Sequence, residues 1–497
     1  MPVGNCFAQL TTLDGVPELS RRRRTLILAI CCMSLLIVGM DATIVNIALP
    51  AIRTDLHASL SGLQWTVDAY TLVLASLLML SGSTGDRLGR RRTFQTGLAV
   101  FTVGSLLCSV APGLGALVVF RMVQAVGGSM LNPVAMSIIT NVFTEPRERA
   151  RAIGVWGGVI GISFGMGPVV GGLLIEAVGW RSIFWINVPI GVAAFVLAAM
   201  YVPESKAPRA RRVDLVGQVA VAVLLASLTY AIIEAPRVGW ISAQTTGLMG
   251  LAAAALVVVL WYEPRRVDPL LDLRFFRSIP FSGATLTAIS AFGAFAGFLF
   301  LNTLYLQDVR GLSAVRAGLC TLPLAVMTMI FAPLSGRLVG ARGPRLPLLA
   351  AGVGLSAGAA MLVGIGAHTP LTWVIASYVV FSIGFGLVNA PITNAAMSGM
   401  PRSQAGVAAG VASTSRQVGA AFGVAVIGSI LNSGLHGSSV GTGFAGASRP
   451  AWLVIVGCGV AVLVLGLLTT GRRAVGTASR TSGLFDEDER AQKAAAF

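Results

Sequence analysis

The sequence predicts an all-α polytopic membrane protein, and three observations lead to this prediction. Of the 497 residues, 55% are hydrophobic and 11% are charged, whereas about 25% of the residues of a typical soluble protein are charged. Apolar runs recur from residue 25 to residue 470, and each is close to the roughly 20 residues that a helix needs to cross a bilayer. The arginines gather in short segments between these runs.

We expect fourteen transmembrane helices, because polar connectors separate fourteen apolar runs. The expected ranges are 25–49, 63–82, 94–111, 115–140, 151–176, 182–202, 213–233, 245–262, 281–306, 314–336, 346–366, 371–398, 406–432 and 451–470. With the N-terminus inside, the arginine-rich connectors fall on the inner side, as the positive-inside rule requires. Both termini are therefore predicted to be cytoplasmic (N-in/C-in).

Composition also excludes several classes of protein. The net charge of +16 reflects arginines placed beside membrane spans, which is a topology signal and not a nucleic-acid-binding pattern. The six cysteines have neither metal-ligand spacing nor a disulfide framework. Since no catalytic constellation or nucleotide-binding loop is visible, we expect no enzyme activity, no metal and no cofactor.

Two segments of the chain resemble later segments at nearly the same offset. "SGSTGDRLGRRR" (81–92) aligns with "SGRLVGARGPRL" (335–346), and "GGSMLNP" (127–133) aligns with "GFGLVNA" (384–390). Such repeats predict two parallel six-helix bundles. The expected organisation is a cytoplasmic tail (1–24), an N-terminal bundle (25–202), a linker region with two extra transmembrane helices (203–280), a C-terminal bundle (281–470) and a disordered cytoplasmic tail (471–497).

Several motifs resemble one known family. "GSTGDRLGRRRTF" (82–94), "RMVQAVGGS" (121–129) and "GMGPVVGG" (165–172) are similar to motifs of the major facilitator superfamily. "MDATIVNIALP" (40–50) and "WTVDAYTL" (65–72) resemble its branch of fourteen-helix drug:proton antiporters.

The resemblance implies the major facilitator fold. It also implies proton-coupled antiport of small amphipathic drugs or antibiotics by a monomer in the bacterial cytoplasmic membrane. The expected partners are therefore a small-molecule substrate, protons and the lipid bilayer, with no nucleic acid. An alternative is a dedicated exporter of one endogenous metabolite, such as a self-made antibiotic or a siderophore.

Two acids and one arginine lie inside the apolar runs. Asp41, Asp68 and Arg121 are expected at comparable depth in the outer half of the membrane. Intramembrane charges cost about 2.5–3.5 kcal/mol or more, and they usually face a cavity and serve function. The simplest arrangement pairs Arg121 with one acid and leaves the other free to titrate. Asp41 is the first candidate for the proton carrier, while a structural ion pair at Asp41 and a solvent-facing Asp68 are the alternatives.

Polar residues in other spans are candidates for lining the substrate cavity. Gln64 shares a helical face with Asp68, and Gln124 and Asn132 share one with Arg121. The complete set comprises Gln64, Gln124, Asn132, Gln307, Asn389 and Asn394. Each of these side chains could instead join two helices. Arg416 lies inside the expected span 406–432 and resembles a family feature, but its role does not follow from the sequence.

Glycines recur on one face of the expected helix 151–176. Small residues on one face let two membrane helices approach closely, and a proline permits a bend. The antiporter-like motif is therefore predicted to form a hinge or a seam between the two halves, with tight packing inside the N-terminal half as the alternative. Its residues are Gly161, Gly165, Gly167, Pro168, Gly171 and Gly172.

A short cytoplasmic loop is expected to act as a conformational latch. It contains Asp86, Arg87, Arg90 and Arg91. Asp86 could bind a neighbouring helix end through its charge and the helix dipole. The alternative is that the arginines only fix the topology.

Overall fold

The computed structural model describes residues 20–206, 214–266, 269–398, 400, 405–435, 438–471, 473–474, 476–481 and 483–485. Most of the two expected tails, 1–24 and 471–497, lies outside the described residues, as does the arginine-rich segment 207–213.

Every regular element among the described residues is helical. The helices are α1 (Arg21–Asp55), α2 (Leu60–Leu88), α3 (Arg90–Ser109), α4 (Leu114–Val142), α5 (Pro146–Ala177), α6 (Ser182–Trp185), α7 (Asn187–Tyr201), α8 (Leu215–Val238), α9 (Ala243–Tyr262), α10 (Ile279–Leu304), α11 (Ala314–Cys320), α12 (Leu322–Arg342), α13 (Arg345–Ala360), α14 (Leu371–Met397), α15 (Ala405–Leu435) and α16 (Val440–Thr469). Two short 3-10 helices, η1 (Glu263–Arg265) and η2 (Leu273–Arg277), and a π-helix, η3 (Tyr305–Val309), lie between them. The described residues 473–474, 476–481 and 483–485 of the expected disordered tail are also helical.

Twelve candidate membrane spans lie within the described residues, judged by helix length and apolar composition. The two remaining expected spans, 94–111 and 346–366, coincide with α3 and α13. Helix α3 begins with three arginines, and α13 has 16 residues. Each of them packs along longer spans, α3 along α4 and α7, and α13 along α14 and α16. The all-helical membrane fold is therefore established, and the count of fourteen stays a prediction.

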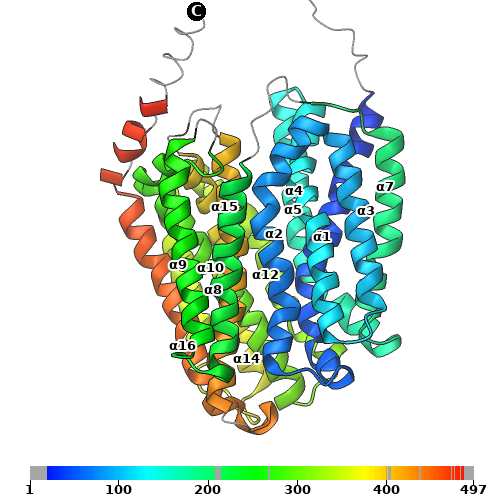
Figure 1. Cartoon of the computed structure of the whole chain (residues 1–497), viewed down its shortest axis with the longest axis vertical. Coiled ribbons are helices and arrows are strands. Elements are labelled where there is room, and N and C mark those ends of the chain that lie inside the picture. Colours follow the sequence, from blue (N-terminus) through cyan, green and yellow to red (C-terminus); the bar gives the residue numbers. More distant parts are fainter. Residues whose placement is uncertain are drawn as a thin grey trace, which may run out of the picture.

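The helices form two groups whose internal contacts repeat. In the first group α1 packs on α5, α2 on α4, and α3 on α4 and α7. In the second group α10 packs on α15, α12 on α14, and α13 on α14 and α16. Figure 1 shows the first group in blue to cyan beside the second in yellow to red. Helix α1 begins and α16 ends at the same end of the molecule, at the top of that view.

The sequence echo at Gly127 and Gly384 marks equivalent close approaches between helices. A Cβ at Gly127 on α4 would lie 2.7 Å from Phe101 Cα on α3, and one at Gly384 on α14 would lie 2.9 Å from Gly354 C on α13. Small residues at these points let the helix backbones touch, and such contact is a main source of stability between membrane helices.

Helices α8 and α9 belong to neither group. They pack on each other, and α8 also lies against α2 of the first group and α15 of the second. Figure 1 shows α8 beside α2 on the face turned to the viewer. The extra helix pair therefore covers one of the lines along which the two groups meet.

Contacts between the groups gather at the end of the molecule where α1 ends. Arg53 Nη1 forms an ion pair with Asp308 Oδ2 at 3.1 Å. Gln307 Nε2 donates to the Ile47 carbonyl at 2.9 Å. Glu176 Oε1, near the end of α5, accepts from the Val315 amide at 2.9 Å. The groups are thus closed against each other at this end, opposite the end where α1 begins.

We predict that Gly127→Val destabilises the fold, because the added methyl groups would force α3 away from α4. Overpacking of this kind costs about 1–3 kcal/mol. The expected result is a lower yield of monodisperse protein in detergent and a lower midpoint of thermal unfolding. Gly115→Val in the same helix is the control, since a Cβ there has no neighbour within 4 Å among the described residues. Equal stability of the two variants would contradict the close approach at Gly127.

Candidate functional site

Asp41 and Arg121 form an ion pair in the centre of the first group. Asp41 lies on α1 and Arg121 on α4, and Arg121 Nη1 donates to Asp41 Oδ2 at 2.5 Å. The side chains are 0% and 1% exposed. Removing two charges from solvent costs several kcal/mol per ion, and the pairing offsets that cost only if the remaining polar atoms are also satisfied.

Neighbouring side chains satisfy those remaining atoms. Gln124 Oε1 accepts from Arg121 Nη1 at 2.6 Å, and Gln124 Nε2 donates to Asp41 Oδ1 at 2.9 Å. Asn187, at the start of α7, donates to the same Asp41 oxygen at 3.1 Å. The Arg121 guanidinium lies 4.2 Å from the centre of the Tyr70 ring, within the range of a cation–π interaction. The ion pair thus joins α1, α2, α4 and α7.

Asp68 on α2 is buried without such partners. The residue is 0% exposed, and neither carboxyl oxygen has a hydrogen-bond partner within the described part of the chain. Burying a carboxyl group without compensating hydrogen bonds is unfavourable, and far more so when it is ionised. Of the three expected charged residues, the structure therefore brings Asp41 and Arg121 together and leaves Asp68 apart.

The position of Asp68 follows from residues one turn away on each side. Gln64 Nε2 donates to the carbonyls of Val424 and Ala425 on α15, at 3.3 and 2.9 Å. Leu72 packs in a small apolar cluster with Ala421 of α15. Since residues four apart share a helical face, Asp68 lies on the face of α2 that meets α15.

The other candidate cavity residues have diverse positions. Gln307 joins η3 to α1, as described above. Asn132 is half-buried, and its Oδ1 has no partner among the described residues. Asn389 is half-buried and Asn394 is exposed, both on α14. The structure thus uses Gln64, Gln124 and Gln307 to join helices, which was the alternative that the sequence left open.

Arg416 is held by hydroxyl groups of the second group of helices. Its Nη2 donates to Thr393 Oγ1 at 2.7 Å and its Nη1 to Ser413 Oγ at 3.4 Å. Its guanidinium carbon lies 5.9 Å from the centre of the Phe292 ring. No carboxylate is bonded to Arg416 among the described side chains.

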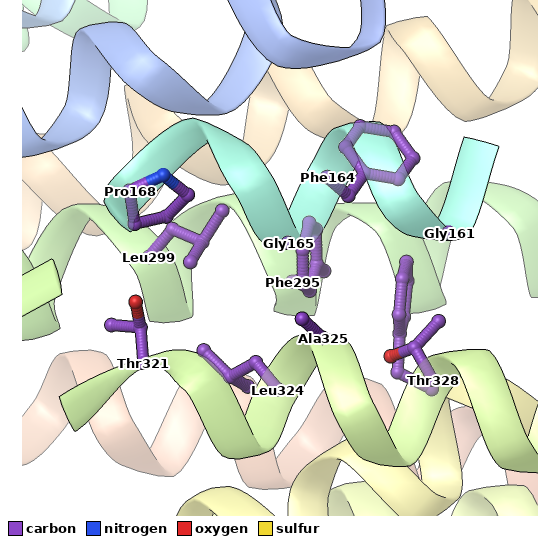
Figure 2. Close-up of a pocket in the computed structure, with 11 residues that line it drawn as sticks. Gly161, Phe164, Gly165, Pro168, Phe295, Leu299, Thr321, Leu324, Ala325 and Thr328 are labelled. Carbon is purple, nitrogen blue, oxygen red and sulfur yellow. The ribbon is translucent and has the colours of Figure 1, made fainter. Parts of the chain in front are cut away.

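The glycine motif of α5 makes close contacts on two sides. Cβ atoms at Gly165 and Gly172 would overlap the second group, at Ala325 Cβ and at the Ala314 carbonyl. A Cβ at Gly171 would instead lie 2.6 Å from Ile44 on α1, and one at Gly167 would also meet α1. Figure 2 shows Gly165 directly opposite Ala325, with Pro168 one turn away. Both sequence interpretations, a seam between the halves and tight packing within one half, are therefore realised on different faces.

The residues of the expected latch lie at a junction of helices. Helix α2 continues to Leu88, so Asp86 lies in its last turn, and Gly89 alone separates it from α3. Asp86 Oδ1 accepts from Arg90 Nη2 at 2.9 Å. Glu204, after α7, accepts from the Arg91 amide at 3.1 Å and thus occupies the positive end of the α3 dipole.

Sequence reasoning missed Asn187, Ser105 and Glu204. Ser105 accepts from Gln124 Nε2 at 2.8 Å, and the other two bind Asp41 and the α3 N-terminus. For Asn187 a signal existed, since an amide interrupts the apolar segment "FWINVPIG" (184–191). Serine within a membrane helix and glutamate beside a helix end are common, so no sequence signal marks Ser105 or Glu204. Only their contacts in the structure show that they belong to the site.

Together these features define a membrane transporter. Charged and amide side chains are buried inside the membrane span, two helix groups share one contact pattern, and the groups are bonded to each other at the end where α1 ends. This combination is typical of transporters that alternate access by rocking two halves.

Comparisons with known proteins give the family. The model of the Major Facilitator Superfamily matches residues 31–424. The Multidrug resistance protein Stp of Mycobacterium tuberculosis is 38% identical over 410 residues, which cover 82% of this chain and 76% of Stp. The Tetracenomycin C resistance and export protein of Streptomyces glaucescens is 37% identical over 409 residues, which cover 81% of this chain and 74% of that protein.

Solved structures agree at the level of the fold. A bacterial homolog to the human lysosomal transporter Spinster, in an inward-facing and occupied conformation, matches with a TM-score of 0.66 and 16% identity. The match covers 93% of this chain and 98% of that chain. The chain belongs to the Major Facilitator Superfamily, whose members transport small molecules, and it is a multi-pass protein of the bacterial inner membrane.

We predict that Gly165→Leu leaves the protein inserted and lowers transport at least about tenfold, the factor that corresponds to ~1.4 kcal/mol. A leucine there would hold α5 away from Ala325 and prevent closure of the seam. Proton-driven dye uptake into inverted membrane vesicles measures the effect. Gly247→Leu on α9 is the control, because a Cβ at Gly247 has no neighbour within 4 Å in the described structure. Full transport by a normally expressed Gly165→Leu variant would contradict the role of the seam.

Proposed function

We propose that this protein exports small amphipathic drugs or antibiotics in exchange for protons. Membership in the superfamily and the names of two relatives, a multidrug resistance protein and an antibiotic resistance and export protein, support this function. The observation that carries the coupling is the unequal environment of two buried acids. Asp41 is bonded to Arg121, Gln124 and Asn187, whereas Asp68 has no partner among the described residues.

We infer that Asp68 carries the transported proton. An ionised carboxylate at its position would have to be stabilised by groups that the described structure does not offer. Burying a neutral, protonated Asp68 in the closed seam costs far less free energy. Asp41 already has a permanent positive partner, so its charge can persist while the conformation changes. From the sequence alone, Asp41 was the first candidate for the proton carrier; this assignment places Asp68 first instead.

The seam between α2 and α15 then links the proton to the conformation. With the groups closed at the outer end, Gln64 is bonded to α15 and Asp68 is dry. Separation of α2 from α15 at that end would expose Asp68 to the outer solution, where it takes up a proton. Return to the closed state would carry the proton inward, and substrate arriving from the cytoplasm would favour its release.

We propose fourteen transmembrane helices with both ends in the cytoplasm. Arginine-rich connectors support the orientation, and the packing of α3 and α13 among longer spans supports the count. In this orientation the closed end faces outward. The proton gradient supplies the driving force, and no cofactor takes part.

A dedicated exporter of one endogenous compound is the second candidate. The Probable actinorhodin transporter of Streptomyces coelicolor, 35% identical over 452 residues, supports it. Export of several unrelated dyes and drugs in an efflux-deficient host would favour the broad function over this one.

We predict that Asp68→Asn inserts normally and abolishes proton-driven uptake of ethidium in inverted vesicles. Asparagine keeps the size of the side chain but cannot release a proton. The same variant should still exchange ethidium down its own gradient, because the seam can still open. Wild-type uptake by Asp68→Asn under a proton gradient would exclude Asp68 as the coupling acid.

Asp41→Asn is expected to behave differently. It leaves Arg121 buried without an anionic partner, and breaking a buried pair in this way costs about 3–5 kcal/mol. The expected result is a reduced yield of folded protein, measured by size-exclusion chromatography in detergent. A well-folded Asp41→Asn variant that has lost only proton-driven uptake would return the coupling role to Asp41.

The topology gives a further prediction. In a variant whose six native cysteines are replaced by serine, Gly113→Cys should react with a membrane-impermeant maleimide added to intact cells. Arg92→Cys should react only after the membrane is opened, since Arg92 lies beside the arginine-rich junction of α2 and α3. Reaction of Arg92→Cys from outside would overturn the orientation.

A further inference from the structure

The two arginines inside the membrane spans differ in how their charge is balanced. Arg121 is bonded to the carboxylate of Asp41. Arg416, on α15, is bonded among the described residues to the hydroxyl oxygens of Thr393 and Ser413, and its Nε has no hydrogen-bond partner there. An intramembrane arginine costs about 2.5–3.5 kcal/mol or more, and such residues usually pair with an anion or face a cavity. The described chain therefore leaves the charge of Arg416 without an anion.

Arg416 lies where the close packing of α15 ends. It is half-buried, roughly 16 Å along α15 from Ala405 at 1.5 Å per residue. Further along, toward the closed end of the molecule, a Cβ at Gly419 would overlap the Ile289 carbonyl of α10. In the other direction, a Cβ at Gly410 would have no neighbour within 4 Å in the described structure. The guanidinium is thus nearer to open space at the end where α15 begins than at the closed end.

A row of aromatic rings extends from Arg416 to the boundary between the helix groups. The guanidinium carbon lies 5.9 Å from the centre of the Phe292 ring, which meets Phe385 at 5.2 Å. Phe385 stacks on Phe295 at 4.0 Å, and Phe295 meets Phe164 of the first group at 6.1 Å. An anion beside Arg416 would therefore have aromatic side chains close by, and these attract other aromatic groups. The surroundings combine one positive charge with apolar ring surface.

Thr393 orients the guanidinium and does not neutralise it. Its hydroxyl group donates to the Asn389 carbonyl at 3.2 Å and accepts from Arg416 Nη2 at 2.7 Å. Since the hydroxyl proton is used for the carbonyl, a lone pair is directed at Arg416. A guanidinium held in this way offers planar N–H donors to a carboxylate or a phenolate. Hydrogen bonds between two charged groups are roughly twice as strong as those between neutral groups.

We propose that Arg416 is the binding site for an anionic group of the substrate, a carboxylate or phenolate on an aromatic amphiphile. The substrate approaches from the end where α15 begins, its anionic oxygen binds the guanidinium, and Thr393 acts as the positioning residue. Asp68 on α2 and Arg416 on α15 then divide the work, since one takes the proton and the other the substrate anion. The substrate class rests on the proposed export function, while the unmet charge rests on the contacts of Arg416.

Two dyes that differ in one group test this site. Rhodamine 110 has a free carboxylate, and rhodamine 123 is its methyl ester. Binding of each dye to the purified full chain in lipid nanodiscs is measured by fluorescence anisotropy. We expect Arg416→Gln to lower the affinity for rhodamine 110 about tenfold, equivalent to ~1.4 kcal/mol, and to lower that for rhodamine 123 far less. The variant should fold, because glutamine can still donate to Thr393 and no described carboxylate loses a partner.

Two further variants make the test specific. Thr393→Val keeps the charge and the shape but removes the oxygen that orients Arg416, so it should weaken binding of rhodamine 110 more than that of rhodamine 123. Arg337→Gln is the control for general electrostatic attraction, because Arg337 is an exposed arginine on α12. It should leave the affinity for both dyes unchanged.

Wild-type affinity of Arg416→Gln for rhodamine 110 would overturn the proposal. Equal losses for the two dyes, an equal loss in Arg337→Gln, or no binding of rhodamine 110 by the wild type would overturn it as well. Proton-driven uptake of rhodamine 123 into inverted vesicles tests the proposed function separately. Its absence would count against proton-coupled export and leave the binding data to decide the role of Arg416.

Discussion

The buried contact between Arg121 and Asp41 is the constraint on which the first helix group depends. A guanidinium cannot lose its proton at any working pH, so α4 must be given a permanent anion and further acceptors within the membrane. Asp41 supplies the anion, Gln124 the neighbouring acceptor, and Asn187 fixes the second carboxylate oxygen. These bonds connect α1, α4 and α7, three helices that are distant in sequence, and they therefore resist movement of these helices relative to one another. A rigid body is what rocking requires, since a soft bundle would absorb the movement internally.

The fixed ion pair also determines what remains for coupling. Asp41 is bonded to Arg121, and α2 contributes a second acid, Asp68, which has no hydrogen-bond partner among the described residues. Asp68 lies on the face of α2 toward α15, between Gln64 and Leu72, and both of these residues touch α15. Its surroundings must therefore change when the groups separate, whereas those of Asp41 need not. The proposed coupling role of Asp68 rests on this position, because a group at a moving interface is one whose two protonation states differ in free energy between the two conformations.

Much of this arrangement could be predicted from the sequence. The apolar runs locate the spans, and the echo of Gly127 at Gly384 marks helix contacts that recur in both groups. Helical periodicity placed Gln124 beside Arg121. The free-energy cost of a charge inside the membrane identified Asp41, Asp68 and Arg121 as candidates for function. Which of the two acids pairs with Arg121 could not be predicted, because Asp41 and Asp68 have similar expected depth. The choice depends on Asn187 and Tyr70, which approach from other helices. Likewise, periodicity shows that α5 has a glycine face but not that Gly167 and Gly171 contact α1 from another face.

The two extra helices explain why the repeated halves have different seams. In a molecule of two equal groups, the α2–α15 and α5–α12 seams would be equivalent and both would face lipid. Here α8 covers the α2–α15 seam, which contains a buried carboxyl group. The α5–α12 seam, which no described helix covers, is lined by glycine and apolar side chains. This distribution follows from the cost of polar groups in hydrocarbon. Under the proposed function, Asp68 gains and loses a proton, and α8 then keeps lipid away from its seam. A seam whose closest contact joins Gly165 to Ala325 buries no charge and can face lipid without penalty.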